Sequence, residues 1–140
     1  MTQTDDLTPP LVYGVGDTSF RAAGGEPGLR ALVEDFYACM DARLFARTIR
    51  AMHPVDLTLA KDKLCLFLCG WLNGPKRYQA KYGEISIPGT HAHLAIGTAE
   101  RDAWLACMRE ALSAQPYEPA FRDYLLTALA KPAARVCNCP

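Results

Sequence analysis

Two of the three histidines of this 140-residue chain lie two positions apart, in the stretch GTHAHLAIG. An imidazole ring can hold a metal ion or move a proton, so the direction in which each ring points matters. Residues two apart on a helix do not share a face. If the segment near 84–94 is helical, His91 lies on the apolar side with Leu94 and His93 lies toward water. The sequence therefore predicts His91 as the inward histidine, either a core residue with a backbone partner or a ligand.

Other polar aromatic groups interrupt apolar stripes elsewhere in the chain. Tyr37 falls between Phe36 and Met40 on the inner side of a predicted helix, and Trp104 lies centrally on the inner side of another. Each carries a hydrogen-bond donor that needs a partner when it is buried. His53 falls in the link between two long predicted helices, where a plain turn residue is the alternative. Aromatic residues at such spacing are mostly core, so only their combination with an inward histidine indicates a pocket.

The elements that must position these groups are predicted to be helices. Apolar residues recur at spacings of three and four in segments that begin near residues 29, 57, 98 and 117. Asp56 and Thr98 are expected to cap two of these helices, and Pro119 falls in the first turn of the last one. A short helix is expected at 17–23, and no stretch alternates as a strand does. The fold class is therefore all-α.

Length and composition favour one globular domain, with residues 17–131 as its body, 1–16 as an irregular lead-in and 132–140 as a tail. Basic and acidic residues number 15 each and no basic run stands out, which argues against nucleic-acid or membrane-surface binding. No apolar run reaches the length of a membrane helix. The acidic start is unlike a signal peptide, so a cytoplasmic location is expected.

The six cysteines fall into two groups. Four lie in apolar periodic segments, where a free thiol packs as a small hydrophobic group: Cys39, Cys65, Cys69 and Cys107. Cys137 and Cys139 instead form a C-x-C pair in the tail, which can bind a soft metal, oxidise, or have no role. An idle tail is the simpler expectation.

An inward histidine together with donors on other helices suggests a pocket around a ligand, and a haem held by one proximal histidine is the known arrangement of this kind. Four stretches of the sequence resemble those of a known family: AGGEPGLRALVEDFYACM, IRAMHPVDL, LFLCGWLNGPKRYQAKYG and HAHLAIGTAERDAWLACMREAL. Over roughly 17–130 the chain resembles the group II truncated haemoglobins, bacterial globins built as a two-over-two helical sandwich. The resemblance implies a globin-like fold and, without a C-x-x-C-H motif, a non-covalently held haem b.

The resemblance also implies roles for particular residues. The proximal iron ligand falls on His91, the distal tyrosine on Tyr37 and the tryptophan that characterises the group on Trp104. His53 occupies a variable polar position that is often tyrosine or histidine in the family. The helix over the distal side contributes the remaining lining residues, which are Ala60, Leu64 and Phe67.

The chain departs from the family pattern at two positions. Ala60 matches the place of the distal histidine of animal globins, and its small side chain implies an open side entrance. Thr90 stands where relatives usually carry an arginine that can pair with a haem propionate, so the anchors must come from elsewhere. The candidates by position are Lys76, Arg77, Tyr78 and Lys81.

These expectations combine into a haem protein that binds oxygen, carbon monoxide and nitric oxide, with oxygen held by Tyr37, His53 and Trp104 and released slowly. The first alternative is a haem enzyme with peroxidase or nitric-oxide-oxidising activity, supplied with electrons by an unidentified reductase. The second is a helical interaction module whose cysteine tail binds metal. The sequence leaves a monomer and a homodimer equally open.

Overall fold

The computed structural model describes residues 12–84, 89 and 91–138. Its elements are α1 (Thr18–Ala22), α2 (Gly25–Ala42), the 3-10 turn η2 (Leu44–Ala46), α3 (Arg47–Ala51), α4 (Thr58–Trp71), α5 (Arg77–Tyr82), α7 (Thr98–Ser113) and α8 (Pro119–Arg135). The described residues contain no strand, which confirms the all-α prediction. The segment expected to carry His91 lies only partly inside the described residues.

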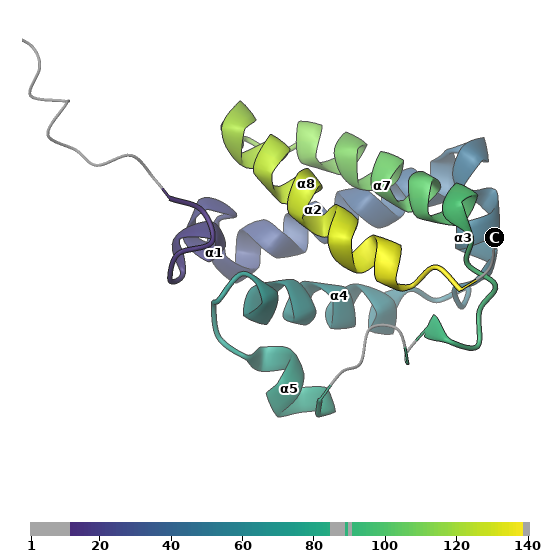
Figure 1. Ribbon diagram of the computed structural model, residues 1–140, viewed down its shortest axis with the longest axis horizontal. Helices are drawn as coiled ribbons and strands as arrows, with labels where there is room; N and C mark the ends of the chain where they lie inside the picture. The colour runs from purple at the N-terminus through teal and green to yellow at the C-terminus, as the bar shows by residue number, and fades with distance from the viewer. Residues whose placement is uncertain (1–11, 85–88, 90, 139–140) are drawn as a thin grey trace, which may run out of the picture.

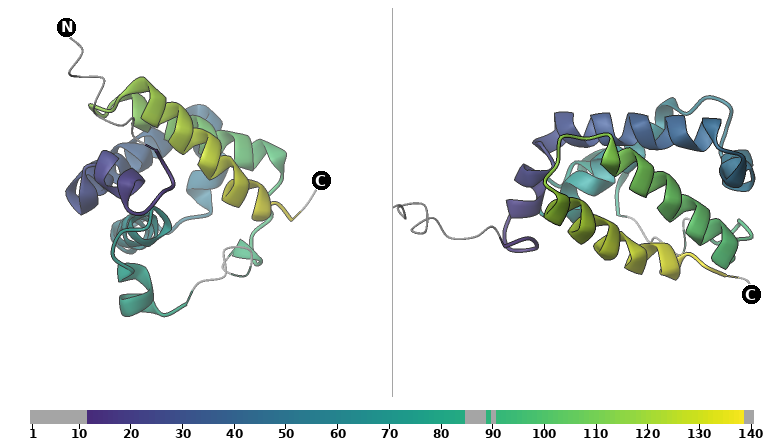
Figure 2. Two further views of the ribbon diagram at one scale, coloured as in Figure 1. Left: turned by 60° about the vertical axis from the view of Figure 1, so that its left-hand side comes forward. Right: turned by 90° about the horizontal axis from the view of Figure 1, so that it is seen from above.

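Two pairs of long helices form the body of the fold (Figure 1). Helix α2 packs against α4 on one side and against α7 on the other, and α7 packs against α8. Helix α5 packs against α4, and α3 with η2 closes the end of α2 and reaches α7. Figure 2 shows α8 alongside α7 in both further views. This pairing is the two-over-two sandwich that the resemblance implied.

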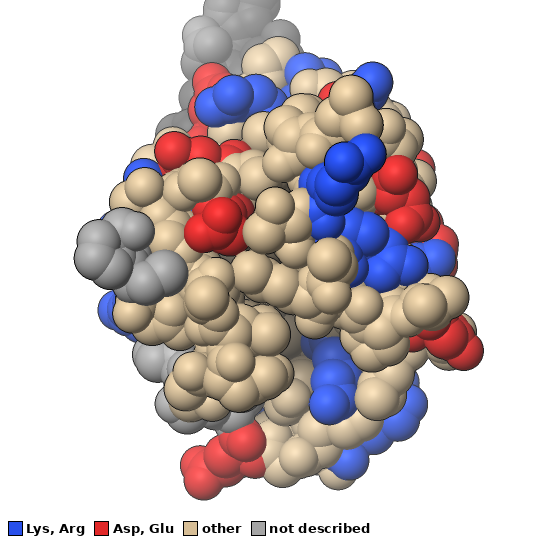
Figure 3. All heavy atoms as spheres, turned by 90° about the vertical axis from the view of Figure 1, so that its right-hand side faces the viewer, with Lys and Arg blue, Asp and Glu red and all other residues tan. Residues whose placement is uncertain are grey.

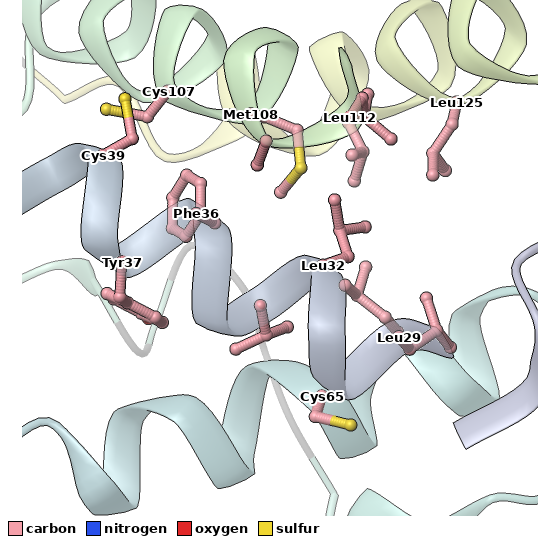
Figure 4. Packing of buried hydrophobic residues seen from close by; sticks show 14 of the residues in the cluster. Leu29, Leu32, Phe36, Tyr37, Cys39, Cys65, Cys107, Met108, Leu112 and Leu125 are labelled. Atoms are coloured by element: carbon pink, nitrogen blue, oxygen red, sulfur yellow. The ribbon is translucent and has the colours of Figure 1, made fainter. Parts of the chain in front are cut away.

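Helix α2 supplies the centre of the core because its apolar residues recur at spacings of three and four. Its fully buried side chains meet those of α7 and α8, as Figure 4 shows for Leu32, Phe36, Met108, Leu112 and Leu125. The apolar stripe of the sequence runs on to Leu44, but α2 ends at Ala42 and the Leu44 side chain is 80% exposed. The extended backbone at Arg43 turns the chain away from the core.

Two glycines in the stretch AGGEPG explain how α1 and α2 meet at a sharp corner. Gly24 precedes α2 with a φ of 87°, a left-handed conformation that glycine adopts without strain. Gly28 passes so close to α1 that a Cβ atom there would lie 2.0 Å from the carbonyl oxygen of Ala23. The corner therefore depends on the absence of side chains at both positions.

The helix ends agree with the sequence in part. Asp56 Oδ1 accepts hydrogen bonds from the Thr58 amide at 2.9 Å and from its hydroxyl at 2.7 Å, although Asp56 lies one position before the capping residue Leu57. Thr98 is not the cap of α7, because the helix already begins there and Glu100 accepts a bond from the Gly97 amide at 2.7 Å. Pro119 lies in the first turn of α8 as expected, but the helix begins there instead of near 117 and continues to Arg135, past the predicted end near 131.

Candidate functional site

One apolar stripe of α4 is left half-buried instead of joining the core. Ala60, Leu64, Phe67 and Trp71 fall within one narrow arc of the helix, and all four are only partly buried. The resemblance assigned Ala60, Leu64 and Phe67 to the lining of a pocket. The side of α4 that packs against α2 carries Cys65, Leu68 and Cys69 instead. A continuous apolar surface of this kind is what a flat apolar group needs from a helix.

Tyr37 projects from α2 on the side away from α7, opposite Cys39 (Figure 4). Its side chain is 5% exposed, and burial raises the pKa of its hydroxyl to about 12, so the hydroxyl keeps its proton at neutral pH. Burial alone causes this shift, with no contribution from a hydrogen bond to another described residue. A protonated donor is therefore held at the edge of the core.

An unbroken series of aromatic rings links the predicted distal residues. The Trp104 ring lies edge-on to Phe36 at 5.1 Å between centroids, and Phe36 lies edge-on to Tyr37 at 5.0 Å. Tyr37 in turn meets the His53 ring at 5.7 Å. These contacts between α2, α7 and the segment after α3 fix the rings by packing, since edge-to-face pairs at such distances are favourable. The structure thus brings Tyr37, His53 and Trp104 into one region.

His53 differs from the expectation that it donates a hydrogen bond to a ligand. Its Nδ1 lies 2.8 Å from the carbonyl oxygen of Ile49, which can only accept, so this nitrogen carries the proton. Burial lowers the pKa of the ring, as do the nearby charges of Arg50 and His91, and they outweigh the bond to Ile49. The neutral ring then presents Nε2 as an acceptor. Tyr37 and Trp104 remain as the predicted donors.

His91 is more buried than His93, as the sequence predicted. His91 is half-buried and His93 is exposed. A single turn holds them, with the Leu94 amide donating to the His91 carbonyl at 3.0 Å. His91 also lies near enough to His53 for its charge to lower the pKa of that ring. His91 is therefore the inward histidine, and its role as an iron ligand stays a prediction.

A cleft of about 260 Å³ opens between α4 and α5, beside the half-buried stripe. Phe67 and Trp71 line one wall, and Lys76 and Tyr78 line the other. The two remaining anchor candidates point elsewhere and are paired: Arg77 with Glu26 at 2.7 Å, and Lys81 with Asp62 at 2.8 Å. The geometry therefore favours Lys76 and Tyr78 over Arg77 and Lys81 as groups that face a ligand.

The residues fit a haem on three separate grounds. The stripe on α4 offers an apolar surface, His91 offers an imidazole, and the largely buried Tyr37 offers a protonated hydroxyl. Lys76 adds a positive charge at the cleft, which suits a propionate carboxylate. An iron porphyrin needs this combination of an imidazole ligand, an apolar cradle and a polar distal side.

Two residues near this region were missed as site residues. Trp71 continues the α4 stripe and lines the cleft, and its spacing from Phe67 was the available signal. Asn138 lies far along the sequence, yet it bonds to the backbone just after His91, at Leu94 and Ile96. Its contacts depend on the tertiary fold, so no local pattern indicates them.

Uncharged side chains cover much of the end of the molecule that carries α3, with basic and acidic side chains interspersed among them (Figure 3). Exposed large apolar residues close to α3 in the sequence are Leu44, Phe45 and Val55. In the part of the chain that the structure describes, no helix has both the length and the apolar character needed to span a bilayer.

Comparisons with known proteins agree on one family. Residues 18–138 match the bacterial-like globin family. The chain is 31% identical to a group 2 truncated hemoglobin of Bacillus subtilis over 114 residues, 81% of this chain and 84% of the relative.

Solved structures give the same answer for the fold. A cold-adapted truncated hemoglobin of Pseudoalteromonas haloplanktis is 30% identical with a TM-score of 0.83, covering 87% of this chain and 98% of that one. A group II 2-on-2 hemoglobin of Agrobacterium tumefaciens is 32% identical with a TM-score of 0.82, covering 94% and 98%. A truncated haemoglobin of Bacillus subtilis, described as oxygen-avid, is 29% identical with a TM-score of 0.78, covering 86% and 98%.

Proposed function

The chain belongs to the bacterial-like globin family, as a group II truncated haemoglobin, and from this premise we propose that it binds oxygen reversibly and releases it slowly. Membership of the family implies a haem cofactor. We take this to be haem b held without a covalent bond, and the same site to admit carbon monoxide and nitric oxide. When bound, a ferrous haem would supply a metal that takes up diatomic gases, and His91 would be the residue that holds it.

Each of the chain's own residues has a separate task in this proposal. His91 supplies the imidazole ligand from the turn before α7, and the half-buried stripe of α4 excludes water from the distal side. Lys76 and Tyr78 hold the polar edge of the cofactor. Trp104 and Tyr37 donate hydrogen bonds to a ligand that gains negative charge on binding, and such bonds stabilise by about 1.5–3 kcal/mol each.

The buried Tyr37 hydroxyl carries the proposal. A hydroxyl with its pKa raised to about 12 stays a donor across the physiological range, and packing against Phe36 and His53 limits its rotation. A donor fixed in advance favours a charged ligand over carbon monoxide, which gains little charge. Slow oxygen release follows, which suits a scavenger or sensor better than a rapid carrier. The oxygen-avid relative of similar fold supports this direction.

Two measurements test the proposal on the purified full chain. An absorption spectrum with a Soret band establishes the haem, and stopped-flow mixing of the oxygenated protein with excess carbon monoxide gives the oxygen dissociation rate. We expect a Soret band and slow dissociation. A protein without bound haem after reconstitution would refute the proposal. Rapid oxygen release from a haem-loaded protein would refute the claim of slow release.

An enzymatic role makes a different prediction from the same preparation. A peroxidase or nitric-oxide-oxidising enzyme turns over repeatedly when peroxide or nitric oxide is supplied with a reductant. In an enzymatic role, the neutral His53 ring beside Tyr37 would accept a proton at Nε2, because its Nδ1 proton is already bonded to Ile49. Sustained turnover that falls when His53 is replaced would assign the enzyme role, whereas stoichiometric binding without turnover supports the proposal above.

A further inference from the structure

The end of the chain is tied to the linker between His91 and α7. The backbone N–H of Asn138 donates to the Ile96 carbonyl at 2.8 Å, and the backbone N–H of Ile96 donates to Asn138 Oδ1 at 2.9 Å. Asn138 Nδ2 also donates to the Leu94 carbonyl at 2.6 Å. These contacts join residues more than forty positions apart, and they contradict the expectation of an idle tail.

An asparagine suits this position because it meets a donor and an acceptor at once. Its Oδ1 faces the Ile96 N–H, and its Nδ2 faces the Leu94 carbonyl, so the surrounding backbone fixes which end of the amide is which. Asn138 thus makes two bonds with Ile96, one from its backbone N–H and one to its side-chain oxygen. The Cys137 thiol adds a weaker contact to the Gly97 carbonyl at 3.6 Å.

The bonded linker leads directly to His91. The Leu94 amide closes the turn that carries His91 by donating to the His91 carbonyl at 3.0 Å, while the Leu94 carbonyl is the group held by Nδ2. Leu94 is therefore bonded on one side to the histidine turn and on the other to the tail. Ile96, which is 7% exposed, anchors the far end of the linker next to α7.

We propose that Asn138 is a positioning residue for His91, and that the tail fixes the linker 94–97 so that the histidine turn holds its orientation. Asn138 acts through its bonds to the backbone of Leu94 and Ile96. Groups that orient a metal ligand from outside its contact shell commonly affect how firmly the metal is held. The proposal rests on the haem function above, and it predicts that a change at the end of the chain alters haem retention.

The first experiment tests the bonds themselves and needs no haem. Amide hydrogen exchange is measured by mass spectrometry or NMR on full-length wild type, Asn138→Ala and Arg135→Ala. Arg135 ends α8 with an exposed side chain, so it is a matched control close to the same place. We expect exchange at Ile96 to rise at least about tenfold in Asn138→Ala, because the amide loses its acceptor. Exchange in Arg135→Ala stays at the wild-type rate.

The second experiment tests the effect on the histidine. Haem transfer to excess apomyoglobin is timed for the same proteins, and the iron–histidine stretching band of each ferrous protein is recorded by resonance Raman. We expect Asn138→Ala to lose haem about five- to tenfold faster and to show a broadened or shifted band. Asn138→Asp keeps the acceptor for Ile96 and lacks the donor for Leu94, so it protects the Ile96 amide but still loses haem faster than wild type.

The outcomes separate this proposal from the proposed function. Wild-type protein that takes up no haem refutes the function, while the exchange experiment still decides whether Asn138 holds the linker. Unchanged exchange at Ile96 overturns the positioning role. A second outcome also overturns it: Asn138→Ala exchanges faster at Ile96, but its rate of haem loss and its iron–histidine band equal those of Arg135→Ala. The tail would then hold the linker without affecting His91. Should Asn138→Ala fail to fold, Asn138→Asp is judged by its haem loss and its iron–histidine band, since its Ile96 amide stays protected; values equal to those of Arg135→Ala would then overturn the proposal.

Discussion

The rings of Tyr37 and His53 meet edge to face, with their centroids 5.7 Å apart. Burial raises the pKa of the tyrosine to about 12, while the pKa of the histidine is lowered, chiefly by burial. At neutral pH the pair therefore consists of a protonated hydroxyl and an uncharged imidazole whose Nδ1 proton is already bonded to Ile49. The hydroxyl is the donor of this pair, and its removal should have the larger effect on ligand release.

Tyr37→Phe removes that hydroxyl with almost no change in volume. We expect oxygen to dissociate about 10- to 150-fold faster, since a hydrogen bond to a charged acceptor contributes about 1.5–3 kcal/mol. Stopped-flow replacement of oxygen by carbon monoxide measures the rate. Tyr13→Phe, at the opposite end of the core beside Phe121, is the control and should leave the rate unchanged. A change of less than twofold in Tyr37→Phe would rule out the hydrogen-bond explanation.

Trp104→Phe keeps an aromatic ring against Phe36 but removes the indole N–H. We expect an effect on oxygen dissociation similar to that of Tyr37→Phe, and a smaller effect on carbon monoxide, which gains little charge. The double variant with Tyr37→Phe should depart from the sum of the single effects, because donors to one ligand are coupled. Strict additivity of the two changes, measured by the same stopped-flow method, would argue that they act on different ligands or steps.

His91→Ala should abolish stable haem binding, whereas His93→Ala should leave the haem spectrum near normal. The reason is the difference in burial: the His91 side chain is half-buried and the His93 side chain is exposed, on the same turn. The Soret band after reconstitution and size exclusion provides the measurement. A reversed result would assign the ligand to His93. Equal loss of haem in both variants would reject the argument that only His91 points inward.

The helix assignment was predictable from the sequence because helical spacing of apolar residues is a local signal. The stripe of α2 from Leu32 to Met40 predicted both the helix and its buried side. In α4 the same spacing is shared by Phe67 and Trp71, which stay half-buried, while Cys65 and Cys69 are buried. Periodicity shows which residues share a face, and it does not show whether that face meets protein or a ligand.

The candidate site was predictable to a similar extent. The facing rule selected His91 over His93, and the resemblance placed Tyr37, His53 and Trp104, which the structure brings together. The proton on His53 Nδ1 was not predictable, because it depends on the Ile49 carbonyl in the folded backbone. Tail contacts were missed for the same reason. Hydrogen bonds to distant backbone groups leave no periodic trace in a sequence.

Gly28→Ala tests the close approach of α1 and α2. The added methyl group would lie 2.0 Å from the Ala23 carbonyl oxygen, a backbone atom that cannot move without shifting the corner. We expect a loss of about 1–3 kcal/mol in the free energy of unfolding, measured with urea. Gly70→Ala is the control inside α4, where the nearest atom would lie 3.6 Å away. That change should be neutral or slightly stabilising, because alanine favours a helix over glycine.

Asp62→Asn tests an ion cluster that ties α5 to α4. Asp62 accepts hydrogen bonds from Lys81 at 2.8 Å and Tyr82 at 2.6 Å, and these bonds lower its pKa from 3.8 to about 2. A carboxyl with a lowered folded-state pKa stabilises the protein above its unfolded pKa, and this contribution is lost as the pH falls through the folded value. We expect Asp62→Asn to lower the free energy of unfolding by about 1–2 kcal/mol at pH 7.

The pH dependence of that difference separates the ion cluster from a simple loss of packing. Between pH 3.8 and about 2 the gap between wild type and Asp62→Asn should close, because the wild-type carboxyl gains a proton over this range. Urea unfolding at several pH values measures both curves. Glu34→Gln is the control, since its ion pair with Lys61 involves a 56% exposed carboxylate and should contribute about 0.5 kcal/mol or less. A gap that stays constant down to pH 2 would show that the charge of Asp62 is not what stabilises the junction.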